Sequence, residues 1–152
     1  MSLVVVAADQ LSKWVVTTSL MLGERVAVLP FFSWVRWHND GAAFSMFSGA
    51  GGRWFFVALA VGFTIFIIYE LRRLPLPGRL MGWAYALILG GALGNGVDRL
   101  LHGYVVDFVL VHHGDWYFPA FNVADSSLTV GAALWILALV REYMAQRGAR
   151  EA

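Results

Sequence analysis

Cysteine is absent from this chain of 152 residues, and charged residues are scarce. Without cysteine there is no disulfide, no thiolate nucleophile and no cysteine-ligated zinc site. Only 14% of the residues are charged, against about 25% in an ordinary soluble domain, whereas 59% are hydrophobic. The net charge of +1 provides no broad basic surface for nucleic acid. This composition predicts an integral membrane protein without a nucleic-acid partner.

Four apolar segments approach the roughly 20 residues that a helix needs to cross a bilayer. They predict one α-helical membrane domain over residues 1–152, with no room for a second folded domain. The first residues lack the basic start of a cleaved signal peptide and run directly into Asp9, so we expect them to belong to a retained helix. The expected spans cover about 3–22, 54–71, 80–101 and 123–140, and the two long connections are 23–53 and 102–122.

The first span carries two opposite charges, Asp9 and Lys13. Residues four apart share one face of a helix, so these side chains can neutralise each other. We expect a structural ion pair that fixes the packing of this helix against other spans. The alternative is a direct role for both residues at a functional site.

The first long connection changes its hydrophobic period. Residues 25–30 and 32–38 are short, aromatic and β-branched runs, which favour strands. Asn39-Asp40-Gly41 is a strong turn signal. The apolar residues 42–47 then predict an interfacial flap beside a small sheet on the membrane surface. Four aromatic residues suit the water–lipid interface, either as anchors or as substrate contacts: Trp34, Trp37, Phe44 and Phe47.

Small residues recur every four positions along the third span. Gly82, Ala86, Gly90 and Gly94 form a smooth stripe, which allows another helix to approach closely. This stripe leads to Asp98 at the end of the span.

Polar residues gather between the third and fourth spans. Asn95, Asp98 and Arg99 project from one side of the helix end because their spacing is i, i+3, i+4. Asp107 lies in an expected strand over 104–111, and Asp125 lies near the start of the last span. An ionisable side chain near the middle of a bilayer costs about 2.5–3.5 kcal/mol on insertion scales, which makes such groups candidates for function.

Basic residues near the span ends predict the orientation. The short loop between the second and third spans and the C-terminal tail are both rich in arginine, so the positive-inside rule places both termini in the cytoplasm. Asp98, Asp107 and Asp125 then lie together at the outer end of the membrane. The arginines concerned are Arg72, Arg73 and Arg79 in the loop and Arg141, Arg147 and Arg150 in the tail, which we expect to be a frayed helix.

Two carboxylates that face each other in a partly dry site share a proton and titrate as a coupled pair. One can then deprotonate water while the other polarises a carbonyl, which is amide hydrolysis without a covalent intermediate. Asp107 and Asp125 could form such a pair, with neither fixed as acid or base. The competing structural interpretation makes Asp125 an N-cap and places Asp98 with Arg99 in a helix-end ion network.

Other functions compete with this hypothesis. Ser126 or Ser127 with His112 could suggest a serine hydrolase, although adjacent serines at a helix start are typical capping groups. His112 and His113 point in opposite directions on a strand, which disfavours a metal site. Membrane aspartates also serve ion- or proton-coupled transporters. A purely structural role for the polar residues is a third possibility.

Five motifs in order resemble the lipoprotein signal peptidase family, also called signal peptidase II, the bacterial intramembrane aspartic proteases. The motifs span nearly the whole chain and are Asp9-Gln-Leu-Ser-Lys13, Asn39-Asp-Gly-Ala-Ala-Phe-Ser45, Gly94-Asn-Gly-Val-Asp-Arg99, Val105-Val-Asp-Phe108 and Phe121-Asn-Val-Ala-Asp-Ser126.

The resemblance implies four transmembrane helices with a small periplasmic β-cradle and an interfacial flap, in the bacterial inner membrane. It implies removal of signal peptides from prolipoproteins by cleavage before a cysteine that carries diacylglycerol, without cofactor or metal. It places the catalytic aspartates at Asp107 and Asp125. Supporting residues would be Asn39, Asn95, Asp98, Arg99 and Asn122, with Asp9 and Lys13 as structural polar residues. We expect a monomer that works among membrane lipids.

Overall fold

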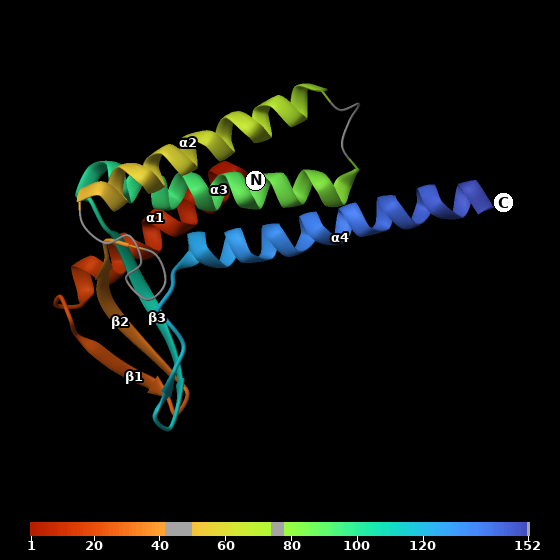
Figure 1. Ribbon diagram of the computed structural model, residues 1–152. Coiled ribbons are helices and arrows are strands. Elements are labelled where there is room, and N and C mark those ends of the chain that lie inside the picture. The colour runs from red at the N-terminus through yellow and green to blue at the C-terminus, as the bar shows by residue number, and fades with distance from the viewer. Residues whose placement is uncertain (42–49, 74–77, 152) are drawn as a thin grey trace.

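The structure is a computed structural model that describes residues 1–41, 50–73 and 78–151. Its described part contains four helices and one four-stranded sheet (Figure 1). The helices are α1 (Ser2–Ser19), α2 (Ala50–Arg73), α3 (Arg79–His102) and α4 (Val123–Glu151). The strands are β1 (Arg25–Leu29), β2 (Phe32–Asn39), β3 (Val105–His113) and β4 (Trp116–Tyr117).

Three of the described helices, α2, α3 and α4, are long and apolar enough to cross a membrane. They match the expected spans 54–71, 80–101 and 123–140. The predicted first span, 3–22, is not confirmed, because α1 is only 18 residues long and carries Asp9, Gln10 and Lys13 in its middle. The charged tail continues α4 as a helix through Glu151.

α3 lies at the centre of the helical part and packs against α1, α2 and α4. Glycines on two of its faces permit this close packing. A Cβ at Gly90 would lie 2.6 Å from Cβ of Val5 on α1, and one at Gly91 would lie 2.5 Å from the carbonyl oxygen of Ala124 on α4. The predicted stripe is therefore confirmed at Gly90. It does not extend to Gly82, where a Cβ would meet nothing within 4 Å.

The sheet is antiparallel with strand order β1-β2-β3-β4. The predicted strands 25–30, 32–38 and 104–111 are confirmed within a few residues. β3 is the most buried strand, because β2 and β4 flank it and α3 packs against it. The register of β2 against β3 shifts between Trp34 and Trp37, and Trp37 then pairs with Asp107.

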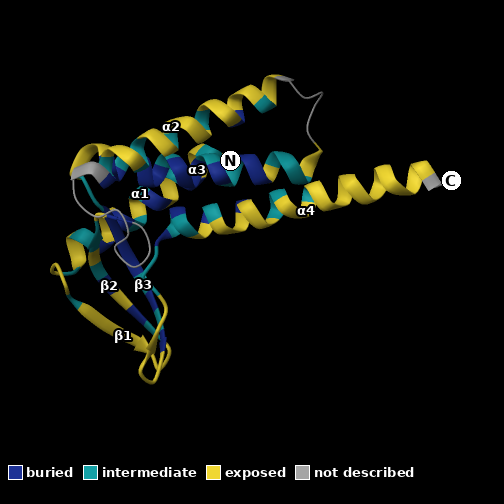
Figure 2. Ribbon diagram, in the orientation of Figure 1, coloured by how far each residue is buried: buried dark blue, intermediate teal, exposed yellow. Residues whose placement is uncertain are grey.

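Burial is uneven over the molecule (Figure 2). Buried residues concentrate on α3 and β3, whereas the outer surfaces of α2 and of the distal half of α4 are exposed. Many of these exposed side chains are large and apolar, as expected for surfaces in contact with lipid. Trp34 and Trp37 are each 39% exposed, as an interfacial position requires. The predicted flap, 42–47, with Phe44 and Phe47, lies outside the described residues.

Candidate active site

The candidate site forms where three elements end or begin together. α3 ends with Asn95, Asp98 and Arg99, and the chain turns directly into β3, which carries Asp107. The chain then returns through β4 to the first turn of α4, which carries Asp125. The prediction that these polar residues converge at one end of the helices is confirmed. We refer to Asp107 and Asp125 as the carboxylate pair.

Asn122 connects the two members of the carboxylate pair. Its side-chain Nδ2 donates to Oδ1 of Asp107 at 2.8 Å, and its backbone N–H donates to Oδ2 of Asp125 at 3.2 Å. Its Oδ1 accepts the backbone N–H of Asp125 at 3.0 Å. This reciprocal arrangement is a capping box at the start of α4, with Asn122 in the N-cap position. The N-cap role considered for Asp125 therefore belongs to Asn122, and Asp125 is its reciprocal partner.

Two further amides donate to the carboxylate pair, and each has its orientation set by another partner. Asn95 accepts from Nζ of Lys13 at 3.0 Å through Oδ1, because an ammonium can only donate. Its Nδ2 therefore faces Oδ1 of Asp125, at 2.7 Å. Asn39 accepts the backbone N–H of Gly41 at 3.1 Å and donates to Oδ2 of Asp107 at 2.9 Å.

A second group of charges lies next to the pair, and we call Asp9, Lys13 and Asp98 the lysine cluster. Nζ of Lys13 lies 2.7 Å from Oδ2 of Asp9 and 2.8 Å from Oδ2 of Asp98. All three residues are buried. The predicted ion pair between Asp9 and Lys13 is thus confirmed within α1, and the second contact of Lys13, with Asp98, joins α1 to α3. Asp9 also accepts the backbone N–H of Ala124 at 2.8 Å, so that α1 helps to cap α4.

Gln10 is a member of this network that sequence reasoning missed. Its Nε2 donates to Oδ1 of Asp98 at 2.7 Å and lies 3.3 Å from both Oδ2 of Asp9 and the carbonyl oxygen of Gly94. The signal available in the sequence was its position between Asp9 and Lys13.

Arg99 does not join the ion network that was considered for it with Asp98. Its guanidinium donates to the carbonyl oxygen of Gly41 at 2.8 Å and lies over the ring of Phe56, 4.4 Å from the centroid. Asp98 instead pairs with Lys13. The two adjacent residues diverge because neighbours on a helix lie about 100° apart around its axis. Arg99 therefore links α3 to α2 and to the end of β2.

Asp107 is 4% exposed, and its environment favours the protonated carboxyl. Burial, together with the nearby negative charge of Asp125, raises the pKa of Asp107 to about 7, although hydrogen bonds from Asn39 and Asn122 oppose the shift. At neutral pH the carboxylate pair can therefore hold one proton, which is the charge state that acid–base catalysis with water requires.

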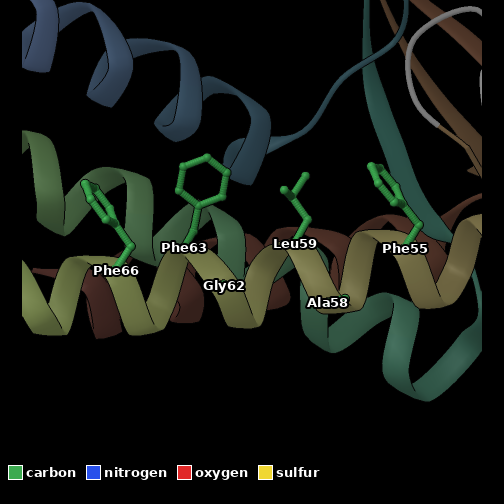
Figure 3. Close-up of a pocket in the computed structure, with 6 residues that line it drawn as sticks. All are labelled: Phe55, Ala58, Leu59, Gly62, Phe63 and Phe66. Atoms are coloured by element: carbon green, nitrogen blue, oxygen red, sulfur yellow. The ribbon is translucent and has the colours of Figure 1, made fainter.

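The carboxylate pair faces a cleft of about 990 Å³. Residues of β2, β3, α2, α3 and α4 line it together with the segment 117–121, and the polar lining residues include Asn39, Asn95, Arg99, Asp107 and Asp125. An apolar groove of about 440 Å³ adjoins it along α2, because Leu59 and Phe63 line both. In Figure 3 the side chains of Phe55, Leu59, Phe63 and Phe66 project from the same side of α2.

The serine alternative finds no support in the geometry. His112 is buried, and its Nε2 lies 2.9 Å from Oγ of Ser33, whereas Oγ of Ser126 donates to the carbonyl oxygen of Asn122. His113 is exposed, so the two histidines point to opposite faces as predicted.

The fold and the site together define a membrane enzyme with paired buried carboxylates at the end of its helices. Comparison with known proteins identifies its kind. The family model of signal peptidase (SPase) II matches residues 1–141. The lipoprotein signal peptidase of Shewanella woodyi is 50% identical over 139 residues, which cover 90% of this chain and 79% of that one. The lipoprotein signal peptidase of Burkholderia vietnamiensis is 51% identical over 137 residues, covering 89% and 82%.

Solved structures agree with this result. A bacterial membrane enzyme determined by the in meso method at 2.3 Å resolution matches with a TM-score of 0.84 and 36% identity, over 93% of this chain and 86% of that one. A second, at 1.9 Å resolution, matches with a TM-score of 0.79 and 37% identity, over 91% and 88%. The chain therefore belongs to the signal peptidase II family and is an aspartic endopeptidase of that type.

Proposed function

We propose that Asp107 and Asp125 are the catalytic residues with which this endopeptidase removes signal peptides from prolipoproteins. The observation that carries the proposal is the position of Asn122, which donates to both carboxylates at the wall of the cleft. Both residues lie within residues 1–141, which match the family model. The comparisons give no support to a transporter.

In this mechanism a water molecule lies between the two carboxyl groups. The ionised carboxylate takes a proton from the water as its oxygen attacks the carbonyl carbon of the scissile bond. The protonated partner donates to the carbonyl oxygen, and the tetrahedral intermediate then collapses as a proton passes to the leaving amine. The raised pKa of Asp107 supports a shared proton near neutral pH. The position of that proton changes during the cycle, so neither residue is only an acid or only a base.

The supporting residues hold the pair in its reactive geometry. Asn39, Asn95 and Asn122 present donors to the carboxylates. Lys13 of the lysine cluster donates to Oδ1 of Asn95 and so sets the orientation of that amide. Arg99 connects the backbone at Gly41 to the cleft wall, where it can hold the backbone of a bound peptide. These roles explain why so many polar groups surround two carboxylates without an ion pair to them among the described residues.

The substrate is a prolipoprotein whose cysteine carries diacylglycerol, and the cut precedes that cysteine. The acyl chains stay in the bilayer, so the scissile bond lies at the membrane surface. The apolar groove along α2 adjoins the cleft and offers the acyl chains or the signal peptide a path to it.

The same proposal includes the topology. α1 forms the fourth span of a single membrane domain over 1–152, because its side opposite Asp9 and Lys13 exposes apolar residues such as Leu3, Leu11 and Trp14. Both termini are cytoplasmic, and the site faces the outer side of the bacterial inner membrane. A monomer contains the complete site.

The decisive experiment uses the purified protein with a diacylglyceryl-modified precursor and with its unmodified twin. We expect cleavage of the modified precursor only, immediately before its cysteine, and none with Asp125→Asn. Arg150→Gln, an exposed change in the tail, serves as the control and retains activity. Equal cleavage of both precursors would contradict the lipid requirement, and activity in Asp125→Asn would contradict the assignment of the carboxylate pair.

A further inference from the structure

Arg25 on β1 is held in place by one residue from each of the other three strands. Its Nε donates to Oγ of Ser33 on β2 at 3.0 Å, and its Nη2 lies 3.0 Å from Nε2 of His112 on β3. On β4, its Nη1 lies 3.4 Å from the hydroxyl of Tyr117, whose ring centroid is 5.4 Å from the guanidinium carbon. Ser33 and His112 are themselves buried and 2.9 Å apart. The guanidinium is therefore fixed although Arg25 is exposed.

This cation has no acidic partner among the residues that the structure describes. The adjacent carboxylate of Glu24 accepts the backbone N–H of Met21 at 2.6 Å. A guanidinium has five N–H donors. Three are used by Ser33, His112 and Tyr117, which leaves one on each terminal nitrogen. A fixed positive charge with a free two-pronged donor is the arrangement that binds a carboxylate or a phosphate.

The position of the sheet indicates which of these two anions Arg25 would bind. The sheet extends sideways from the helices, across the direction in which α2, α3 and α4 run (Figure 1). With those helices spanning a bilayer, the sheet lies along the membrane surface. Its free end exposes rings suited to the headgroup region, with Phe31 at 53% and Trp116 at 59% exposure. Arg25 is not among the residues that line the cleft, although Tyr117 is, so the guanidinium is not placed to bind a peptide held there.

We propose that Arg25, together with Tyr117, forms a subsite for the phosphate group of a membrane phospholipid. The two free N–H groups of Arg25 donate to two phosphate oxygens, and the Tyr117 hydroxyl lies beside them. The exposed rings at the end of the sheet contact the glycerol and the upper acyl chains. This site is separate from the carboxylate pair, and binding there does not depend on the peptidase mechanism.

The test measures the thermal unfolding midpoint of the purified full chain in a neutral maltoside detergent. Dihexanoyl phosphatidylglycerol is titrated against wild type, Arg25→Gln, Arg25→Lys and the exposed tail control Arg150→Gln. Dihexanoylglycerol is the phosphate-free probe, glycerol phosphate is the lipid-free probe, and an acidic peptide is the carboxylate probe. Arg25→Lys keeps the charge but not the fork, so a folded variant remains available if Arg25→Gln unfolds.

We expect a saturable rise of the midpoint with phosphatidylglycerol in wild type and Arg150→Gln. Because a hydrogen bond to a charged group contributes about 1.5–3 kcal/mol, the affinity should fall at least roughly tenfold in Arg25→Gln and detectably in Arg25→Lys. The proposal is overturned if dihexanoylglycerol shifts the midpoint equally or if neither Arg25 variant loses affinity. Saturation by glycerol phosphate or by the acidic peptide at the concentration at which the lipid saturates would also overturn it, in favour of free phosphate or of a peptide carboxylate.

Discussion

Two groups of carboxylates lie side by side in this molecule, and the protein treats them in opposite ways. In the lysine cluster, Asp9 and Asp98 share the ammonium of Lys13 at 2.7 and 2.8 Å. In the carboxylate pair, the hydrogen bonds that Asp107 and Asp125 receive from the described residues come from neutral amides and a backbone N–H group. The first group contains its own counter-ion and serves as a framework. The second has no ion-pair partner among the described residues, holds a proton and faces the cleft, which is what a reactive pair requires.

The sharpest test of this difference is to neutralise one member of the carboxylate pair. Asp107→Asn should lower the rate of precursor cleavage by about 10²–10⁴-fold, because general acid–base catalysis is lost. The thermal midpoint should stay the same or rise, because a buried carboxyl group whose charged form is disfavoured is replaced by a neutral amide. Cleavage rate per folded molecule and thermal unfolding are measured together. A loss of activity that only follows abundance would indicate a structural role.

The corresponding change in the lysine cluster should act mainly on stability. Lys13→Met leaves Asp9 and Asp98 buried without an ion-pair partner, which costs about 3–5 kcal/mol of the free energy of unfolding. The measurement is the yield of folded protein and its thermal midpoint, with the exposed change Arg141→Met as control. A stable Lys13→Met protein with normal yield would show that the cluster is not the framework described here.

Helix packing next to the site should be less sensitive than either group. Gly91→Ala places a Cβ 2.5 Å from the carbonyl oxygen of Ala124, directly before Asp125, and should cost about 1–3 kcal/mol through overpacking. Gly82→Ala is the matched control, because a Cβ there meets nothing within 4 Å. That control should gain up to about 1 kcal/mol from helix propensity. Equal effects in chemical unfolding would contradict the packing described for α3 and α4.

A last test concerns pH. The pKa of Asp107 is raised from 3.8 to about 7 in the folded protein. Because the folded value is the higher one, the associated stability is complete below pH 3.8 and is lost as the pH rises to about 7. Asp125→Asn removes the neighbouring charge, so it should lower the pKa of Asp107 and weaken this pH dependence. Thermal midpoints between pH 4 and pH 8 would show it, and an unchanged slope would refute the coupling.

The parts of the molecule that followed from the sequence are those with a local physical cause. β-branched and aromatic runs indicated β2 and β3, and apolar length indicated α2, α3 and α4. Consecutive spans are joined at the same side of the membrane, so the end of the third span and the start of the fourth had to lie close together. This predicted that Asp98, Asp107 and Asp125 would meet. Spacing of four indicated the pair of Asp9 and Lys13.

The features that escaped prediction depend on contacts between distant parts of the chain. The direction of Arg99 is set by Phe56 and by the backbone of Gly41, neither of which its own helix reveals. The orientations of Asn39 and Asn95 depend on single partners elsewhere in the fold. The contacts of Arg25 with residues of the other three strands could not be predicted without knowing the strand order.

The contact between Asp9 and the backbone of Ala124 joins residues 115 positions apart. During membrane insertion the first helix leaves the ribosome long before the last, so the start of α4 cannot be capped in this way until both have docked. Asp125 follows directly after Ala124, and its geometry is completed only at that late step. Under the proposed assignment of the carboxylate pair, a half-inserted chain would therefore be inactive.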